Sequence, residues 1–385
     1  MKLSHSIPLA ALMSATLLLP VAASAVDDGG QNHGPMSAPL PTNQYLIANL
    51  TTNLSSSAPN TDAHMVNPWG MSRGSATPWW LADNAAGLAT LYLGTGQSVP
   101  IVVTIPPAKA GSGMMGSPTG TIFNGAMEFA IPGGQPARFL FATEDGTISG
   151  WNPAVNPSSA VIAVNESQMG ASFKGLTSAT LDMQGMSAQT LLYAADFTLG
   201  KVEVFDGMFH HVVSIEQQFN DGGEDMPDGY APFNVQNLGG NIFVAYAKLG
   251  SGISEQQGPG LGMVRVFSPD GHMLMHLEHG SWMNAPWGMA IAPSDFGPYS
   301  HSILVGNFGS GAVAAFDPET GRFQDFLRDM NGKQLSIPGL WGISPGNDSK
   351  AGNATSIYFS AGGANEYSGT FGSITAVENP QGNAQ

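Results

Sequence analysis

Four side chains with oxygen ligands recur at one position of a repeated pattern, and their chemistry suits a hard cation. Each stands at the end of a short apolar segment: Asp83, Glu144, Asp196 and Asn307. Carboxylate and amide oxygens are the ligands that Ca²⁺ and Mg²⁺ prefer. The alternative is that each caps its own turn, since short polar side chains readily bond neighbouring backbone amides. The sequence therefore leaves two interpretations open, a shared site for Ca²⁺ or another divalent cation and separate turn caps.

A second candidate is segment 272–279, which reads His-Met-Leu-Met-His-Leu-Glu-His and contains ligands that suit copper. In a strand, at about 3.3 Å per residue, His272 and His276 would lie about 13 Å apart, too far to share an ion. Strand alternation instead places Met273, Met275 and Leu277 on one face. The pattern favours a half-buried outer strand.

Other catalytic motifs are absent from the sequence. It has no phosphate loop, His-Glu-x-x-His or dinucleotide fingerprint before a helix. It also has no cysteine, which excludes thiol catalysis, disulfides and thiolate metal sites. No catalytic residue can be named.

The elements that must position these side chains repeat six times. Repeats starting near residues 67, 117, 173, 231, 285 and 338 are separated by 50 to 58 residues. Each has a start rich in Gly and Pro, an apolar strand, a second apolar strand that often ends in an acid or Asn, and in several a third strand such as residues 200–206. Three or four short strands per repeat predict an all-β, six-bladed β-propeller. A solenoid is the alternative, although its repeats are usually shorter and need capping ends.

A propeller gives the repeated residues a structural meaning. The innermost strands line a central channel, so their starts and the ends of the second strands meet around one mouth. Glycine there removes side-chain bulk where six backbones converge, and proline is tolerated at a strand's first residue. The Trp-Gly pairs at Trp69, Trp287 and Trp341 are interpreted either as packing between blades or as a platform for a ligand.

The two ends of the repeat array complement each other. The sixth repeat stops after the strand at 372–377, with no room for an outer strand, and the strand at 45–50 precedes the first repeat without a partner. Pairing these two strands closes the ring and removes an exposed edge. The sequence therefore predicts a propeller closed by its N-terminal strand.

The N-terminus has the pattern of an export signal. Met1-Lys2 precedes an apolar stretch and then Ala23-Ser24-Ala25, a signal-peptidase type of site. We expect a signal peptide at 1–25, a flexible segment at 26–43, the propeller at 44–378 and a flexible tail at 379–385. The mature protein would be soluble and periplasmic or extracellular.

Composition narrows the function classes. Charged residues make up 10% of the chain, and the formal net charge is −16. Of the 385 residues, 50 are glycine and 27 are proline. Nucleic-acid binding needs clustered Lys and Arg, which are missing. With 42% hydrophobic residues the chain can bury a large core, yet no run after the signal peptide is long enough to span a membrane. A small molecule or a protein is the expected partner.

Several motifs resemble an uncharacterised family of exported bacterial six-bladed propellers akin to NHL-repeat and gluconolactonase-like proteins. The motifs include Asn67-Pro68-Trp69-Gly70, Ala82-Asp83-Asn84, the segment at 142–153 and Gly339-Leu340-Trp341-Gly342. Some members end in a sorting segment with Pro-Glu-Pro, which this chain lacks. The gluconolactonase likeness implies a divalent cation at the channel mouth that polarises a lactone and activates water. Virginiamycin-lyase-like propellers use His and Glu, but no residue pair here matches them.

Taken together, these patterns predict an exported, non-enzymatic binding module whose channel mouth holds a small ligand or cation. The alternative is a divalent-metal-dependent hydrolase or lyase at the same mouth.

Overall fold

The computed structural model describes residues 42–377 apart from 55–56, 183–186 and 220–225. The predicted signal peptide 1–25, all but the last two residues of the segment 26–43, and the tail 379–385 lie outside the described residues.

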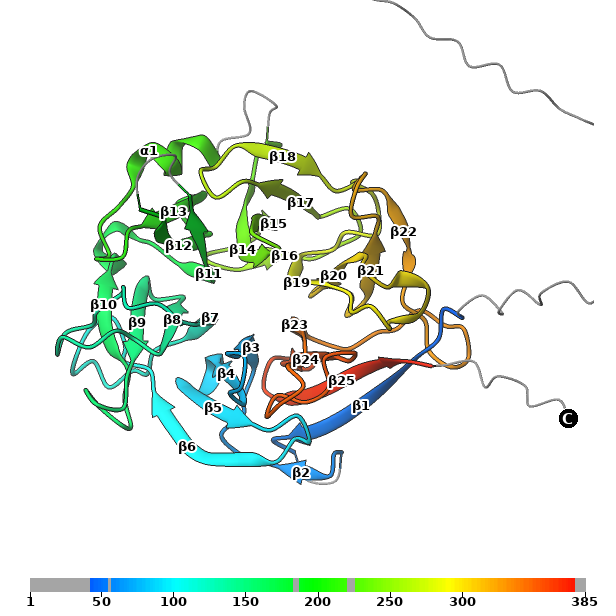
Figure 1. The fold of residues 1–385 in the computed structure, drawn as a ribbon, viewed down its shortest axis with the longest axis horizontal. Coiled ribbons are helices and arrows are strands. Elements are labelled where there is room, and N and C mark those ends of the chain that lie inside the picture. Colours follow the sequence, from blue (N-terminus) through cyan, green and yellow to red (C-terminus); the bar gives the residue numbers. More distant parts are fainter. Residues whose placement is uncertain (1–41, 55–56, 183–186, 220–225, 378–385) are drawn as a thin grey trace, which may run out of the picture. The chain divides into compact units, whose positions relative to one another are not determined.

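Six antiparallel sheets stand around a central channel and form the blades of a propeller (Figure 1). The innermost strands are β3 (Pro68–Ser72), β7 (Pro118–Phe123), β11 (Phe173–Leu181), β14 (Tyr230–Leu238), β19 (Pro286–Ile291) and β23 (Leu340–Pro345). The second strands are β4 (Trp79–Asp83), β8 (Phe139–Thr143), β12 (Gln189–Asp196), β15 (Asn241–Leu249), β20 (Ile303–Asn307) and β24 (Ile357–Ala361). The third strands are β5 (Leu88–Tyr92), β9 (Thr147–Trp151), β13 (Lys201–Phe205), β17 (Gly262–Phe267), β21 (Val313–Phe316) and β25 (Thr370–Ala376).

The outer strands differ between blades. Four blades end in β6 (Ser98–Thr104), β10 (Val161–Asn165), β18 (Met273–His276) and β22 (Phe323–Phe326), and β16 (Glu255–Gln256) adds to β15. The third blade has three strands, and α1 (Val213–Glu216) with η3 (Gln217–Phe219) lies outside β13. The remaining short helices are η1 (Asn84–Ala86), η2 (Ser167–Met169) and η4 (Gly297–Tyr299).

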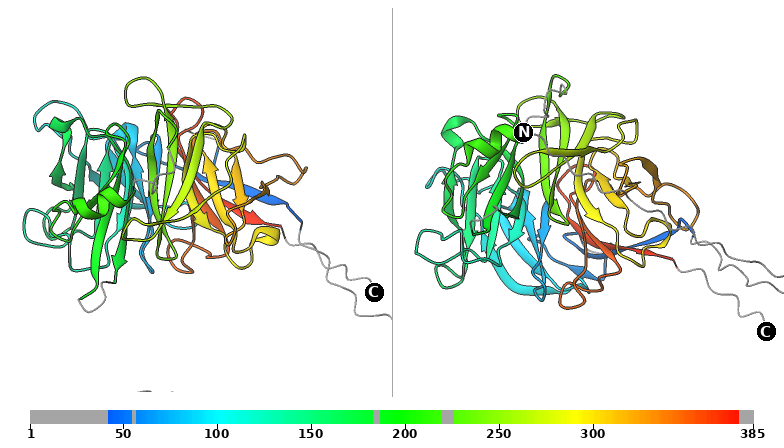
Figure 2. Two further views of the ribbon diagram at one scale, coloured as in Figure 1. Left: turned by 90° about the horizontal axis from the view of Figure 1, so that it is seen from above. Right: turned by 45° about the horizontal axis from the view of Figure 1, so that its top comes forward.

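These sheets confirm the predicted all-β, six-bladed propeller. Viewed from the side, the strands run between the two faces of the ring (Figure 2). The closed ring of sheets excludes the solenoid (Figure 1). Within the described residues, no helix has the length and apolar character needed to cross a membrane.

The N-terminal strand closes the ring as predicted. β1 (Tyr45–Thr52) pairs antiparallel with β25, from Tyr45 opposite Ala376 to Thr52 opposite Thr370, and also carries the short strand β2 (Asn60–Thr61). Tyr45 is buried, its ring centroid lies 4.8 Å from that of Phe296, and its hydroxyl donates to the Phe296 carbonyl. The sixth blade thus contains both ends of the described chain.

Apolar side chains fill the spaces between neighbouring blades. Alternate residues of a strand point to opposite faces of its sheet, so in β13 the side chain of Phe205 packs in the core between blades two and three, whereas Val202 and Val204 pack in the core between blades three and four. Because both faces of each sheet are covered, the second strands are almost entirely buried.

Glycines in the inner strands allow adjacent blades to approach closely. A Cβ added at Gly70 would lie 2.4 Å from the Thr119 oxygen of the next blade, and one at Gly120 would lie 2.3 Å from the Leu176 nitrogen of the blade after that. Backbone atoms cannot move aside without separating the blades. The predicted role of glycine where the backbones converge is therefore confirmed at these positions.

Gly120→Ala is expected to lower the free energy of unfolding by about 1–3 kcal/mol, the usual cost of overpacking a closely packed site. Urea denaturation would measure the change. Gly125→Ala is the control, because its added Cβ would meet only the ring edge of Phe123, at 3.3 Å. Equal stability of the two variants would contradict the close-approach explanation.

Candidate functional site

The channel has two ends that differ in chemistry. We call the end where the inner strands begin the leading end and the end where they finish the trailing end. At the leading end, the strand pairs Pro68–Asp83, Pro118–Thr143, Phe173–Asp196 and Pro286–Asn307 occupy equivalent places in four blades. Glu144 follows Thr143 directly. The predicted equivalence is thus confirmed for Asp83, Asp196 and Asn307, whereas in the second blade Thr143 takes this place and Glu144 lies one residue beyond it.

Asp83 is fully buried at the end of β4. Its Oδ2 accepts a hydrogen bond of 2.7 Å from the Thr90 hydroxyl, whereas its Oδ1 is buried without a hydrogen-bond partner among the described residues. Burial raises the pKa of Asp83 well above its usual range, and the bond from Thr90 offsets part of this shift. The environment therefore favours the protonated carboxyl.

Asp196 holds the turn after β12. Its Oδ1 accepts hydrogen bonds from the backbone amides of Ser172, Thr198 and Leu199 at 3.0–3.1 Å. Burial raises the pKa of Asp196, and these amide bonds oppose the rise. Its Oδ2 is buried without a hydrogen-bond partner in the described part of the chain. The amide contacts have the geometry of a turn cap.

Asn307 makes similar local contacts at the end of β20. Its Oδ1 accepts a hydrogen bond of 2.8 Å from the Asn284 amide, and its Nδ2 donates to the Ala312 carbonyl at 3.4 Å. These bonds join the two loops that flank Asn307. Asn307 therefore matches the turn-cap interpretation.

Glu144 differs from the other three because it neutralises a buried cation. Its Oε1 forms an ion pair with the Lys174 ammonium, and its Oε2 accepts a hydrogen bond of 2.9 Å from Asn84. The Lys174 side chain is only 2% exposed, and its ammonium lies 5.0 Å from the Trp69 ring centroid and 5.8 Å from that of Phe197. A carboxylate is thus required beside this lysine.

The three acids at the leading end do not share one ion-sized space. Among the described residues, one set of three acid or histidine side chains has its ligand atoms within 4.8 Å of one another, and it contains none of Asp83, Glu144 and Asp196. That set is Glu166, Glu203 and His211, which lies outside the channel. A cation shared at the leading end remains a prediction from the sequence.

Aromatic rings close the channel between its two ends. The buried cluster contains Trp69, Phe197, Phe233, Trp287, Phe308 and Trp341. The ring of Trp341 stacks on Trp69 at 3.7 Å and on Phe308 at 3.8 Å, and its Nε1 donates to Asn67 Oδ1. The three Trp-Gly tryptophans therefore pack blades together across the channel, which matches the packing interpretation.

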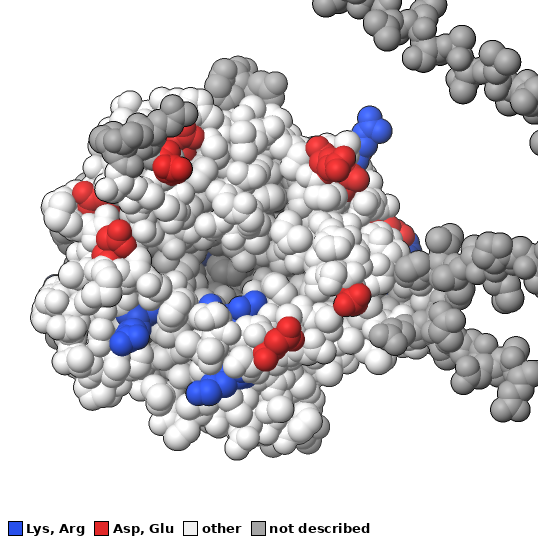
Figure 3. Space-filling model, in the orientation of Figure 1, with Lys and Arg blue, Asp and Glu red and all other residues white. Residues whose placement is uncertain are grey.

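A cavity of about 320 Å³ occupies the trailing end of the channel. Its lining comes mainly from the second halves of five inner strands, and Trp287 belongs to both this lining and the aromatic cluster. Figure 3 shows one face of the protein, hollowed at the centre of the ring and with Lys or Arg side chains close to the hollow. The cavity lies at the opposite end from the four residues that the sequence singled out.

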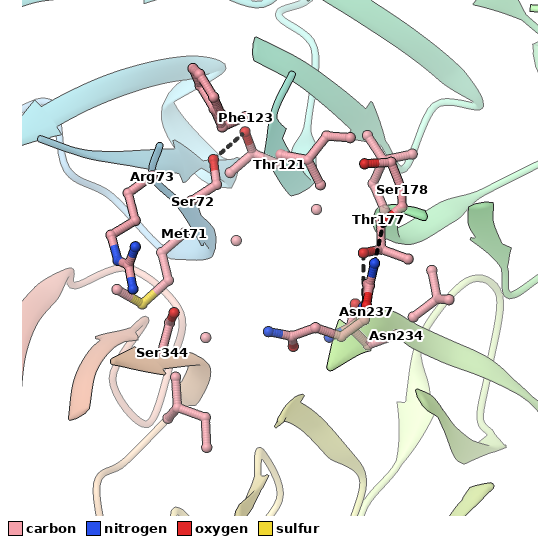
Figure 4. Close-up of a pocket in the computed structure, with 18 of the residues that line it drawn as sticks. Met71, Ser72, Arg73, Thr121, Phe123, Thr177, Ser178, Asn234, Asn237 and Ser344 are labelled. Atoms are coloured by element: carbon pink, nitrogen blue, oxygen red, sulfur yellow. Dashed lines mark hydrogen bonds between the residues drawn. The ribbon is translucent and has the colours of Figure 1, made fainter. Parts of the chain in front are cut away.

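Hydroxyl and amide groups surround this cavity, and most are fixed by bonds within the protein (Figure 4). Ser72 and Thr121 hydroxyls lie 3.3 Å apart, and Asn237 Nδ2 donates to the Ser178 carbonyl at 2.8 Å. Asn234 Nδ2 donates to the carbonyl of Trp287 at 2.7 Å. These contacts fix the positions of polar groups from neighbouring blades.

Arg73 is the charged residue among the described residues that line the cavity. Its Nε donates to the Pro345 carbonyl at 2.8 Å and its Nη2 to the Gly346 carbonyl at 2.7 Å. Burial lowers the pKa of Arg73, and Asp348 opposes the decrease. The guanidinium therefore joins the first and sixth blades at the rim.

The sequence interpretation missed the trailing-end cavity and Lys174. A signal for the cavity does exist, because the inner strands change from Gly and apolar residues to polar ones, as in Ser72-Arg73, Thr177-Ser178 and Gln236-Asn237. The prediction of an outer strand within 272–279 is confirmed for Met273–His276, because β18 is outermost in the fourth blade. No set of three His, Asp or Glu ligand atoms there lies within 4.8 Å of one another among the described residues.

Comparisons with known sequences identify viral relatives. No family model matches the chain. Uncharacterized protein L690 of Acanthamoeba polyphaga mimivirus is 30% identical over 337 residues, which cover 86% of this chain and 84% of that protein. Uncharacterized protein R648 of the same virus is 29% identical over 308 residues, which cover 78% of this chain and 72% of that protein. These relatives are viral, whereas the sequence resemblance pointed to exported bacterial proteins.

Solved structures share the architecture at low sequence identity. A glucose dehydrogenase superposes with a TM-score of 0.51 at 13% identity, covering 86% of this chain and all of that one. A streptogramin B lyase gives a TM-score of 0.48 at 11% identity, covering 86% of this chain and 98% of that one. The likeness to the dehydrogenase shows the propeller fold alone.

Proposed function

The chain belongs to the family of the mimiviral uncharacterized protein L690, and from its own geometry we propose that it is an exported module that binds a neutral, hydroxyl-rich small molecule in the trailing-end cavity. A mono- or disaccharide has this chemistry. The observation that carries the proposal is a cavity lined by fixed hydroxyl and amide groups and by no carboxylate among the described residues.

The polar lining suits a ligand whose groups both donate and accept hydrogen bonds. Ser178 and Ser344 line the cavity, and their hydroxyls make no hydrogen bond to another described residue. Binding sites typically combine a few oriented polar groups with apolar walls, and Met71, Ile122 and Ile343 supply apolar surface here. A sugar presents hydroxyls at its edge and C–H groups on its faces, which matches both kinds of lining.

Charge favours a neutral ligand over an anion. The chain carries a formal net charge of −16, so its overall field opposes the approach of anions. Arg73 already donates to two backbone carbonyls. Uncharged hydrogen-bonding groups therefore dominate recognition in this proposal.

The alternative proposal, a divalent-metal-dependent hydrolase or lyase, requires an acid, a base or a bound metal beside its substrate. Among the described residues that line the trailing-end cavity there is no Asp, Glu, His or Lys. The binding proposal therefore has the stronger support from this cavity. The export part of the proposal rests on Met1-Lys2, the apolar stretch and Ala23-Ser24-Ala25.

Calorimetric titration of the purified protein with glucose, galactose, mannose, maltose and cellobiose would test sugar binding. We expect at least one of these sugars to bind with one site per chain. Ser344→Phe fills the cavity from β23 and should weaken that binding by at least about tenfold, equivalent to about 1.4 kcal/mol. Ser294→Phe is the matched control because Ser294 is exposed in a loop outside the cavity. Unchanged sugar affinity in Ser344→Phe would contradict the proposal.

A further inference from the structure

Three ligand-bearing side chains meet between the second and third blades, outside the channel. Glu166 lies between β10 and η2, Glu203 is at the centre of β13, and His211 follows β13. One ligand atom from each lies within 4.8 Å of the other two. The three come from separate segments, so the packing of the two blades sets their arrangement.

The two carboxylates are buried, and their hydrogen-bonding capacity is not met. Glu203 is fully buried and Glu166 is 6% exposed. Oε2 of each is buried without a hydrogen-bond partner among the described residues. Each carboxyl has one oxygen beside a basic side chain, Lys201 for Glu203 and His211 for Glu166, so the two buried Oε2 atoms are the ones left for a further ligand.

His211 is oriented by a second acid. Its Nδ1 lies 2.7 Å from Glu216 Oε1, and its Nε2 lies 2.5 Å from Glu166 Oε1. Glu216 Oε1 also accepts a hydrogen bond of 3.0 Å from the Val204 amide, which fixes the carboxylate. Glu216 holds Nδ1 of the imidazole ring, so that Nε2 is directed towards the cluster. A carboxylate on the second ring nitrogen is the usual arrangement around metal-ligating histidines.

We propose that Glu166, Glu203 and His211 form a site for one divalent cation of the Zn²⁺ type. Two carboxylates and one imidazole suit Zn²⁺, whereas Ca²⁺ and Mg²⁺ prefer oxygen ligands alone. Three protein ligands also leave a coordination position for water. The His211 side chain is 33% exposed, so an ion can reach the cluster from the solvent.

Lys201 is the group that competes with such an ion. Its ammonium lies 2.9 Å from Glu203 Oε1, and its side chain is 42% exposed. The lysine can therefore rotate into water when a cation enters. Burial, and then a hydrogen bond with the neighbouring Glu166, raise the pKa of Glu203 to about 8, and Lys201 opposes the rise.

Calorimetric titration of the full-length protein with Zn²⁺, after removal of metals with EDTA and dialysis, tests the site. We expect one Zn²⁺ per chain and a higher melting temperature in its presence. Glu203→Gln and His211→Gln should each weaken binding by at least about 100-fold, and Glu216→Gln by about 10–100-fold. Lys201→Gln should tighten it, because the competing ammonium is removed.

Two controls separate loss of the ion from loss of the fold. His210→Gln alters the adjacent histidine, whose side chain is 71% exposed, and should bind Zn²⁺ as the wild type does. Metal-free Glu203→Gln should melt at or above the metal-free wild type, because the substitution removes charge crowding without changing size.

Absence of stoichiometric Zn²⁺ binding would overturn the proposal. An equal loss of Zn²⁺ affinity in His210→Gln and His211→Gln would overturn it as well. A Glu203→Gln variant that binds Zn²⁺ with unchanged affinity would also overturn it. Absence of binding together with a more stable Glu203→Gln variant would show that the two carboxyls share a proton in place of a metal ion.

Discussion

Trp341→Ala is expected to lower the free energy of unfolding by about 3–5 kcal/mol, the range for truncating a large buried aromatic side chain. Trp341 is fully buried and stacks on both Trp69 and Phe308. Its removal opens a void where the blades meet around the channel, and surrounding backbones held by closely approaching strands can collapse only partly. Urea denaturation would measure the loss.

Two other substitutions calibrate this effect. Trp341→Phe keeps an aromatic ring but removes the hydrogen bond to Asn67, so we expect a smaller loss. Trp282→Ala removes a half-buried tryptophan that stacks on Phe323 away from the channel and should also cost less than Trp341→Ala. If Trp341→Ala were no more destabilising than Trp282→Ala, the aromatic cluster would not be a principal support of the ring.

Glu144→Ala is expected to destabilise the protein by about 3–5 kcal/mol, because it leaves the buried Lys174 ammonium without its carboxylate. Replacing both residues, as Glu144→Ala with Lys174→Met, should recover most of this loss, since no unpaired charge remains. A double-mutant cycle in urea would measure the coupling. Glu319→Ala, at an exposed position, is the control for loss of a negative charge.

The same cycle distinguishes two roles for Glu144. If the carboxylate acts mainly on Lys174, the loss in Glu144→Ala is the same with and without EDTA. A loss that disappears when EDTA is present in both samples would indicate a cation ligand instead. A cost below about 1 kcal/mol, the value typical of an exposed ion pair, would contradict the buried-charge explanation.

The sequence predicted the parts of the fold that depend on local pattern. The second strands are apolar on both sides, with little alternation between apolar and polar residues, because both faces of each sheet are covered. They also recur at nearly regular intervals along the sequence. The unpaired strand at each end of the repeat array predicted the β1–β25 closure. Glycine at positions such as Gly70 and Gly120 was informative because a close backbone contact excludes any larger side chain.

The functional groups were harder to predict because they depend on contacts between blades. Lysine is usually a surface residue. Lys174 is buried because the folded chain brings Trp69, Phe197 and Glu144, which are distant in the sequence, into contact with it. In β13, alternation predicts Val202 inside and Glu203 outside, yet the second blade covers the face that carries Glu203. The cavity likewise draws single polar residues from several strands and therefore leaves no contiguous motif.

A crystal structure of the protein soaked with the sugar that binds most tightly tests the central claim most directly. The proposed function predicts one ordered sugar in the trailing-end cavity, with its hydroxyls bonded to Ser178 or Ser344 and its apolar face against Met71, Ile122 or Ile343. A sugar bound at the leading end beside Glu144, or a trailing-end cavity that holds only water at saturating sugar, would contradict it.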